Sequence, residues 1–124
     1  MAIQATYDIA QGIEKGVASN IELELTSTSQ TQVCSFTPSS TEMFIIDVFV
    51  RVTVATTALT LSASWTDASG MAQSYVWENG TNITIGNRLE LPIIITAQSG
   101  SPITVYATAG TANQVYVSAT ISQI

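Results

Sequence analysis

Apolar residues at every second position are the feature that most constrains this chain. Between positions 43 and 54 all even-numbered residues are Phe, Ile or Val, namely Phe44, Ile46, Val48, Val50, Val52 and Val54. Side chains of a β-strand alternate between its two faces, so this period predicts a strand with one buried face. The other face is also unusually apolar, because it carries Met43, Ile45 and Phe49 beside Asp47 and Arg51. We expect that second face to be covered by the N-terminal segment or by another subunit.

The same period of two recurs from Ile21 to the C-terminus. Short stretches rich in Ser, Thr, Asn, Gly and Pro interrupt it, as turns between strands do. About eight short strands at regular spacing indicate an all-β protein, an antiparallel β-sandwich of jelly-roll type. With 124 residues the chain suffices for one such domain. We expect the sandwich to span residues 21–124, after an N-terminal arm of residues 1–20.

The N-terminal arm mixes apolar residues with charges and two glycines. A short helix or an extended arm both fit, although Gly12 and Gly16 disfavour a long helix. Arms of this kind often add a strand to an exposed sheet edge of a partner. The residues predicted to lie at a protein interface are therefore Ile3, Tyr7, Ile9 and Ile13 of the arm, with Met43, Ile45 and Phe49.

Two hairpins are predicted in register. Asp67-Ala-Ser-Gly-Met71 fits a three-residue loop closed by Gly70, which places Trp65 opposite Gln73. Continued along the strands, the register pairs Ala63 with Tyr75 and Leu61 with Trp77, so that both tryptophans become core anchors. A second hairpin of residues 103–109 and 115–121 places Tyr106 and Tyr116 opposite each other on an outer face.

The charge excludes two classes of partner. Only Lys15, Arg51 and Arg88 are basic, and the net charge is −6. Nucleic acids and anionic membranes require clustered cations, so we expect neither as a partner. No basic segment followed by an apolar run opens the chain, and no apolar run could span a bilayer, so we expect a soluble protein made in the host cytoplasm.

The side chains needed for a cofactor are also scarce. There is no histidine, and Cys34 is the only cysteine, so neither an intrachain disulfide nor a Cys/His zinc site can form. We expect Cys34 to be a small buried residue and predict no cofactor and no metal.

Catalysis finds little support. Glu22 and Glu24 could form the carboxylate pair of a glycosidase, but a solvated strand face is the better interpretation, because nothing near them in sequence would raise one pKa. A serine nucleophile would need a base, and the only lysine lies in the arm. We predict that the chain is not an enzyme. Tyr106 and Tyr116 could stack on a sugar ring, although stabilisation of the sheet is the favoured role.

Four stretches carry a family resemblance: EMFIIDVFVRVT (42–53), SWTDASG (64–70), SGSPITVYATAG (99–110) and VYVSATI (115–121). The pattern from Phe36 onward resembles small virion proteins of tailed bacteriophages, the β-sandwich modules of head-decoration proteins, head fibres and tail-tip or receptor-binding proteins. The resemblance leaves residues 1–35 unaccounted for and includes no functional residue. It implies a structural protein on the virion surface, commonly a homotrimer.

Two functions follow as expectations. The first is capsid decoration, in which an oligomer docks on the major capsid protein. The alternative is a tail-fibre or receptor-binding module that recognises surface glycans of the host cell. Because the chain starts directly with a short arm and no upstream shaft, decoration is the favoured expectation.

Overall fold

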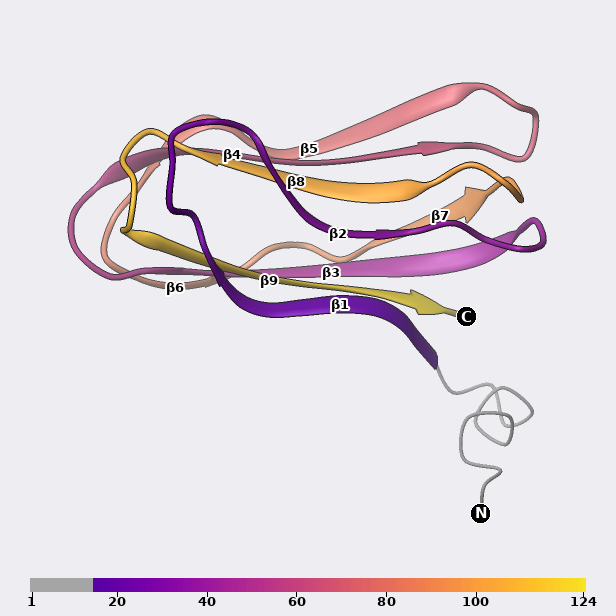
Figure 1. Ribbon diagram of the computed structural model, residues 1–124, viewed down its shortest axis with the longest axis horizontal. Coiled ribbons are helices and arrows are strands. Elements are labelled where there is room, and N and C mark those ends of the chain that lie inside the picture. Colours follow the sequence, from indigo (N-terminus) through magenta and orange to yellow (C-terminus); the bar gives the residue numbers. More distant parts are fainter. Residues whose placement is uncertain (1–14) are drawn as a thin grey trace, which may run out of the picture.

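The computed structural model describes residues 15–124, which form two antiparallel sheets packed face to face (Figure 1). Nine strands are present in this part of the chain, namely β1 (Lys15–Glu24), β2 (Thr31–Phe36), β3 (Glu42–Val52), β4 (Thr57–Thr66), β5 (Ala72–Ile83), β6 (Gly86–Leu89), β7 (Ile93–Ala97), β8 (Ile103–Ala109) and β9 (Val115–Gln123). No helix of the described residues is long and apolar enough to cross a membrane.

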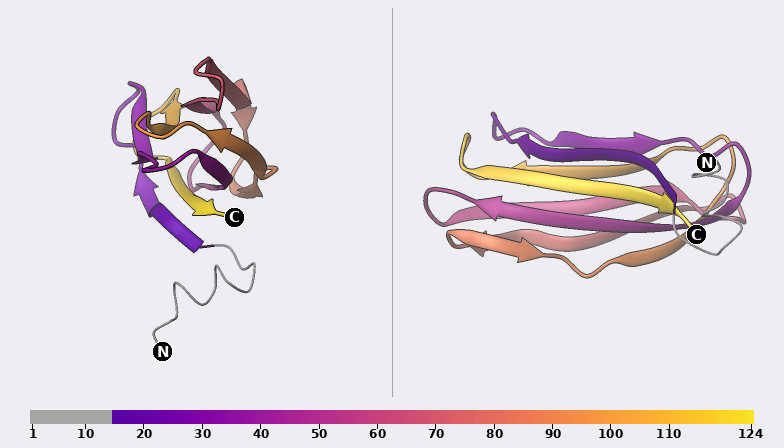
Figure 2. Two further views of the ribbon diagram at one scale, coloured as in Figure 1. Left: turned by 90° about the vertical axis from the view of Figure 1, so that its right-hand side faces the viewer. Right: turned by 90° about the horizontal axis from the view of Figure 1, so that it is seen from below.

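The strand order is that of a jelly roll. One sheet has the order β1-β9-β3, with β6 and β7 both paired to the far side of β3; the other has the order β2-β8-β4-β5. We call these the β9 sheet and the β8 sheet. Since β6 and β7 occupy successive parts of one edge position, the nine strands fill eight positions, four in each layer (Figure 2). The predicted sandwich of jelly-roll type is confirmed.

Strand β3 holds the centre of the core. Phe44, Ile46, Val48, Val50 and Val52 are each at most 2% exposed, as the period of two predicted. They form one core with the alternating apolar residues of neighbouring β9 and with those of β4 and β8 in the opposite sheet. Val54 departs from the prediction: it is 56% exposed, because the strand ends at Val52 and the chain turns toward the other sheet.

The β9 sheet begins earlier than the sequence predicted. Strand β1 starts at Lys15 rather than Ile21, so residues 15–20 belong to the sheet and not to an arm. A register shift between Asn20 and Leu23, where Glu22 has a φ of 58°, breaks the expected alternation. Ile21 is consequently 65% exposed, although it was expected to share a face with buried Leu25. Residues 1–14 lie outside the described part.

The β4–β5 hairpin confirms the predicted register near its tip. Trp65 lies opposite Gln73 and Ala63 opposite Tyr75, but a register shift between Ser62 and Leu61 then places Glu78, not Trp77, opposite Leu61. Residues 78–82 are part of β5, despite a composition that is typical of a turn. Trp65 and Trp77 pack against the core but are only partly buried, so they are not the fully buried core anchors that the hairpin register predicted.

Candidate functional site

Several apolar side chains on the outer side of the β9 sheet are exposed to solvent. Ile45 lies opposite Ile94 of β7, and Phe49 lies opposite Leu89 of β6. Met43, Leu89 and Ile94 are 48%, 70% and 60% exposed. We call Met43, Ile45, Phe49, Leu89 and Ile94 the apolar face. On its other flank, β9 presents a polar row that includes Ser118 and Ser122.

Three of the predicted interface residues, Met43, Ile45 and Phe49, thus lie together on one surface, as the sequence indicated. The sequence analysis did not identify Leu89 and Ile94 as part of this surface, because their pairing with β3 depends on contacts distant in sequence. The predicted interface residues Ile3, Tyr7, Ile9 and Ile13 lie outside the described residues, so their role stays a prediction.

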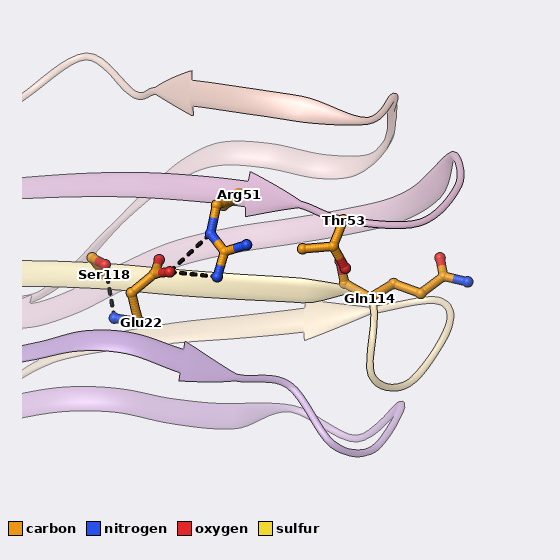
Figure 3. Close-up of polar contacts among 5 residues, drawn as sticks. All are labelled: Glu22, Arg51, Thr53, Gln114 and Ser118. Carbon is orange, nitrogen blue, oxygen red and sulfur yellow. Dashed lines mark hydrogen bonds and ion pairs between the residues drawn. The ribbon is translucent and has the colours of Figure 1, made fainter.

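Beside the apolar face, an ion pair spans three strands (Figure 3). Arg51 of β3 reaches across β9 to Glu22 of β1, with Nε 2.8 Å and Nη2 2.5 Å from Oε1 of the carboxylate. The amide of Glu22 donates to Oγ of Ser118 at 2.9 Å, which fixes the bulged backbone. The hydrogen bond to Glu22 raises the pKa of Arg51. Both side chains are about 40% exposed, so solvent screening keeps the pair weak.

A second contact in Figure 3 fastens the end of β3. The amide and the hydroxyl of Thr53 both donate to the carbonyl of Gln114, at 2.8 and 3.2 Å. This carbonyl precedes β9, so the two neighbouring strands stay in register where β3 leaves the sheet.

The predicted pairing of Tyr106 with Tyr116 is wrong. Strand β8 pairs with β2 and β4, whereas β9 pairs with β1 and β3, so the two strands lie in different sheets and the two rings lie on opposite outer faces. The Arg51 guanidinium lies 4.3 Å from the centroid of the Tyr116 ring and covers one of its sides. A sugar platform that uses both rings therefore does not exist.

The outer side of the β8 sheet is polar and uncharged. Tyr106 lies at its centre, between Gln32 of β2 and Ser62 of β4. The register places no acidic or basic side chain on this side; its residues include Ser35, Thr60, Ser64, Thr66, Ser74, Val76, Thr104 and Thr108. Some hydroxyl groups of this side are bonded within the protein: those of Ser35 and Thr104 lie 3.0 Å apart, and Oγ1 of Thr60 accepts from the amide of Gly80 at 3.0 Å.

A charge cluster of two buried glutamates and one half-exposed arginine links β5 to the segment that contains β6. Nη2 of Arg88 lies 3.0 Å from Oε2 of Glu78, and Nε of Arg88 lies 3.3 Å from Oε2 of Glu90. The two glutamate side chains are only 5% and 7% exposed. Burial, and then the neighbouring carboxyl of Glu78, raise the pKa of Glu90 to about 7. Nε1 of Trp77 donates to the carbonyl of Leu91 at 2.7 Å and ties the same two edges together.

No pattern in the sequence predicts this cluster. The segment around Glu78 has the composition of a turn, and the side to which Glu78 points depends on a register shift in the middle of β5. Arg88 bridges Glu78 and Glu90 and so links the two sheets. Both carboxylates are engaged in these ion pairs.

No cofactor site emerges from the part of the chain that the structure describes. Among residues 15–124, no group of three or more His, Cys, Asp or Glu side chains could hold a metal ion. Cys34 is 8% exposed, and burial raises the pKa of its thiol to about 11, so it is the small buried residue that the sequence predicted.

Comparison with known proteins supports the fold. No family model matches the sequence, and no curated protein is similar to it. Among solved structures, that of infectious bursal disease virus Gx strain matches 88% of the chain with a TM-score of 0.51 at 11% identity, and the chain spans 30% of that protein. The CBM22-1 and GH10 modules of a Clostridium thermocellum xylanase, complexed with xylohexaose, match 90% with a TM-score of 0.48 at 14% identity, over 29% of that protein.

A bacteriophage protein is among these matches as well. The enzymatically active domain of tailspike protein 4 from bacteriophage CBA120 matches 88% of the chain with a TM-score of 0.45 at 12% identity, over 18% of that protein. The chain thus spans less than a third of each of these three proteins. At such low identity the likeness extends to the β-sandwich fold alone.

Proposed function

We propose that the chain is a non-enzymatic structural protein of a bacteriophage virion, which docks on the major capsid protein and assembles with other copies of itself. The observation that carries the proposal is the apolar face on the outer side of the β9 sheet. Three of its side chains are about half to two-thirds exposed, which is unusual for a strand face that stays in water. The resemblance of the sequence to phage head proteins supports the same role.

The absence of a catalytic arrangement within residues 15–124 favours a structural role over an enzymatic one. Glu22 is paired with Arg51, and Glu78 and Glu90 share Arg88. A glycosidase would need one carboxyl as an acid and another facing it across a cleft. Each of these three carboxylates is paired with an arginine instead.

A docking experiment tests the proposal. Shells that lack the protein are mixed with purified chain, and the bound fraction is measured after sedimentation. Leu89→Lys places a charge on the apolar face, opposite Phe49, and should weaken binding at least tenfold, since a desolvated lysine opposes contact. Ile85→Lys is the matched control, because Ile85 is 62% exposed in the turn before β6, outside the apolar face. Equal binding by both variants would refute the docking surface.

Recognition of surface glycans is a second candidate, favoured by one observation. Tyr106 offers a ring among uncharged hydroxyl and amide groups, the combination that binds neutral sugars by stacking and hydrogen bonds. Tyr106→Ala should abolish binding to a glycan array if this surface is a receptor site, with Tyr116→Ala on the opposite face as its control. Copy number separates the two functions: hundreds of copies in a virion indicate the head, and a handful indicates the tail.

A further inference from the structure

The edges of the two sheets differ in how they are protected from pairing with other strands. Edge strands of stable proteins usually carry charges, bulges or covering segments. Strand β1 has two register shifts and the charged residues Glu22 and Glu24, while β2 has one shift. A hydrogen bond of 3.0 Å from Nδ2 of Asn20 to the carbonyl of Val33 bridges these two edges.

On the opposite side of the sandwich the edge strands are β5, β6 and β7, and only β5 and β6 have features that hinder pairing with another strand. Strand β5 has two register shifts, and β6 is fastened to it by the ion pair between Arg88 and Glu78. Strand β7 follows after Pro92 and has none of these features. Its residues, Ile-Ile-Ile-Thr-Ala, are uncharged, and its pairing with β3 shows no register shift.

Strand β7 is therefore a flat edge with a free side. Among the described residues, it pairs with β3 alone, and the backbone groups on its other side face no strand. Its outward residues Ile94 and Thr96 are exposed, and Ile94 belongs to the apolar face. A short apolar edge of this kind is a template for an added strand.

The absence of charge points to a particular partner. In a contact with two-fold symmetry, each residue approaches its own copy or a near neighbour of it, so any charge would face a like charge. Among the other edge strands of the described sandwich, β1, β5 and β6 contain charged residues, and β2 has a register shift. Strand β7, Ile93–Ala97, contains no charged residue. Two copies of β7 can thus pair antiparallel without repulsion, and their two apolar faces would then form one continuous surface.

We propose that β7 pairs with β7 of a second copy, joining two β9 sheets into one sheet that runs through both molecules. This inference rests on the self-assembly included in the proposed function and identifies the contact that produces it. With Ile95 at the two-fold axis, Thr96 of one copy lies opposite Ile94 of the other, and the two Thr96 side chains are diagonal neighbours on the outer side.

A charge-swap experiment on the full-length chain tests the pairing. Thr96→Lys and Thr96→Asp should each weaken self-association about threefold to tenfold, measured by sedimentation equilibrium, because like charges meet across the axis. An equimolar mixture of the two variants should regain the affinity of the unchanged chain. Thr84→Lys, the same change at an exposed position in the turn before β6, is the control and should have no effect.

Hydrogen exchange supplies an independent measurement on the backbone. Those amides of residues 93–97 that do not bond to β3 should exchange more slowly with solvent as the protein concentration rises. The exchange rates of the β1 amides should stay unchanged. Failure of the mixture to recover, a trimer, or association without protection of β7 would overturn the inference. So would loss of that protection after deletion of residues 2–13, which would identify the N-terminal segment as the added strand. None of these results affects docking to shells, which the Leu89→Lys variant tests separately.

Discussion

The charge cluster between the sheets predicts an unusual dependence of stability on pH. The ordinary pKa of a glutamate is 4.5, and in the folded protein burial raises that of Glu90 to about 7. The folded state therefore holds a proton that the unfolded state has already released. Below pH 4.5 both states are protonated and the stability is greatest; as pH rises from 4.5 to 7, stability is lost, and above 7 the loss is complete.

The size of the loss follows from the shift. A rise of the pKa from 4.5 to about 7 corresponds to at most about 3.5 kcal/mol, since each tenfold change in an equilibrium constant is about 1.4 kcal/mol. The physical reason is the surroundings of the carboxyl: Glu90 is 6% exposed, and its Oε2 has no hydrogen-bond donor in suitable geometry among the described residues. Arg88 offsets only part of the cost, because Glu78 competes for the same guanidinium.

The substitution Glu90→Gln tests this reasoning. Glutamine resembles the protonated acid in shape and carries no charge, so the free energy of unfolding of this variant should be nearly constant between pH 4.5 and 8. The unchanged chain should lose about 1–3 kcal/mol over that range. Urea unfolding at a fixed protein concentration, followed by the fluorescence of Trp65 and Trp77, measures both curves. Glu24→Gln, with the same change in charge on the outer side of β1, is the control; a parallel fall in the Glu90→Gln variant would refute the assignment.

Three further predictions concern the sandwich itself. Ile46→Ala, at a side chain with no exposure in the centre of β3, should cost about 2–5 kcal/mol of unfolding free energy, whereas Met43→Ala on the outer side should cost less than about 0.5 kcal/mol. The Cys34 thiol should resist iodoacetamide at pH 8 in the native protein and react readily in urea, because its pKa is about 11 and it is buried. Gly70→Val should lower the unfolding free energy by about 1–2 kcal/mol in the same urea assay, since Gly70 has a φ of 89° that a β-branched residue tolerates poorly.

Features that depend on local periodicity could be predicted from the sequence. The buried face of β3 needs only a period of two, and the pairing of Trp65 with Gln73 needs only the loop chemistry of Asp67 and Gly70. The carboxylate of Asp67 accepts hydrogen bonds from Ser69, Met71 and Gln73, which holds its pKa at about 2 and fixes the turn. These interactions lie within a few residues of one another, so the sequence contains them directly.

Features that depend on which sheet a strand joins could not be predicted in this way. The segment 110–114 has the composition of a hairpin turn, yet it carries the chain from β8 in one sheet to β9 in the other. Its amides at Gly110 and Asn113 donate to the carbonyls of Ala58 and Leu25, at 2.7 and 2.8 Å, and so bind it to both layers. A turn within a sheet and a crossing between sheets need the same residues, and only contacts distant in sequence decide between them.

The free energy gained by burying the apolar face limits the kind of assembly that it can stabilise. Full burial of one large aliphatic side chain contributes about 1.5–3 kcal/mol, and Met43, Leu89 and Ile94 are 48–70% exposed, so covering them adds about 1–2 kcal/mol each. The sum of roughly 3–6 kcal/mol barely exceeds the lower estimates of the entropy lost on association. A single contact of this size is weak, but contacts repeated over a lattice of subunits multiply, because each bound copy holds its neighbours at high effective concentration. Such a face is better suited to a protein that covers a shell in many copies than to one that must bind a receptor alone.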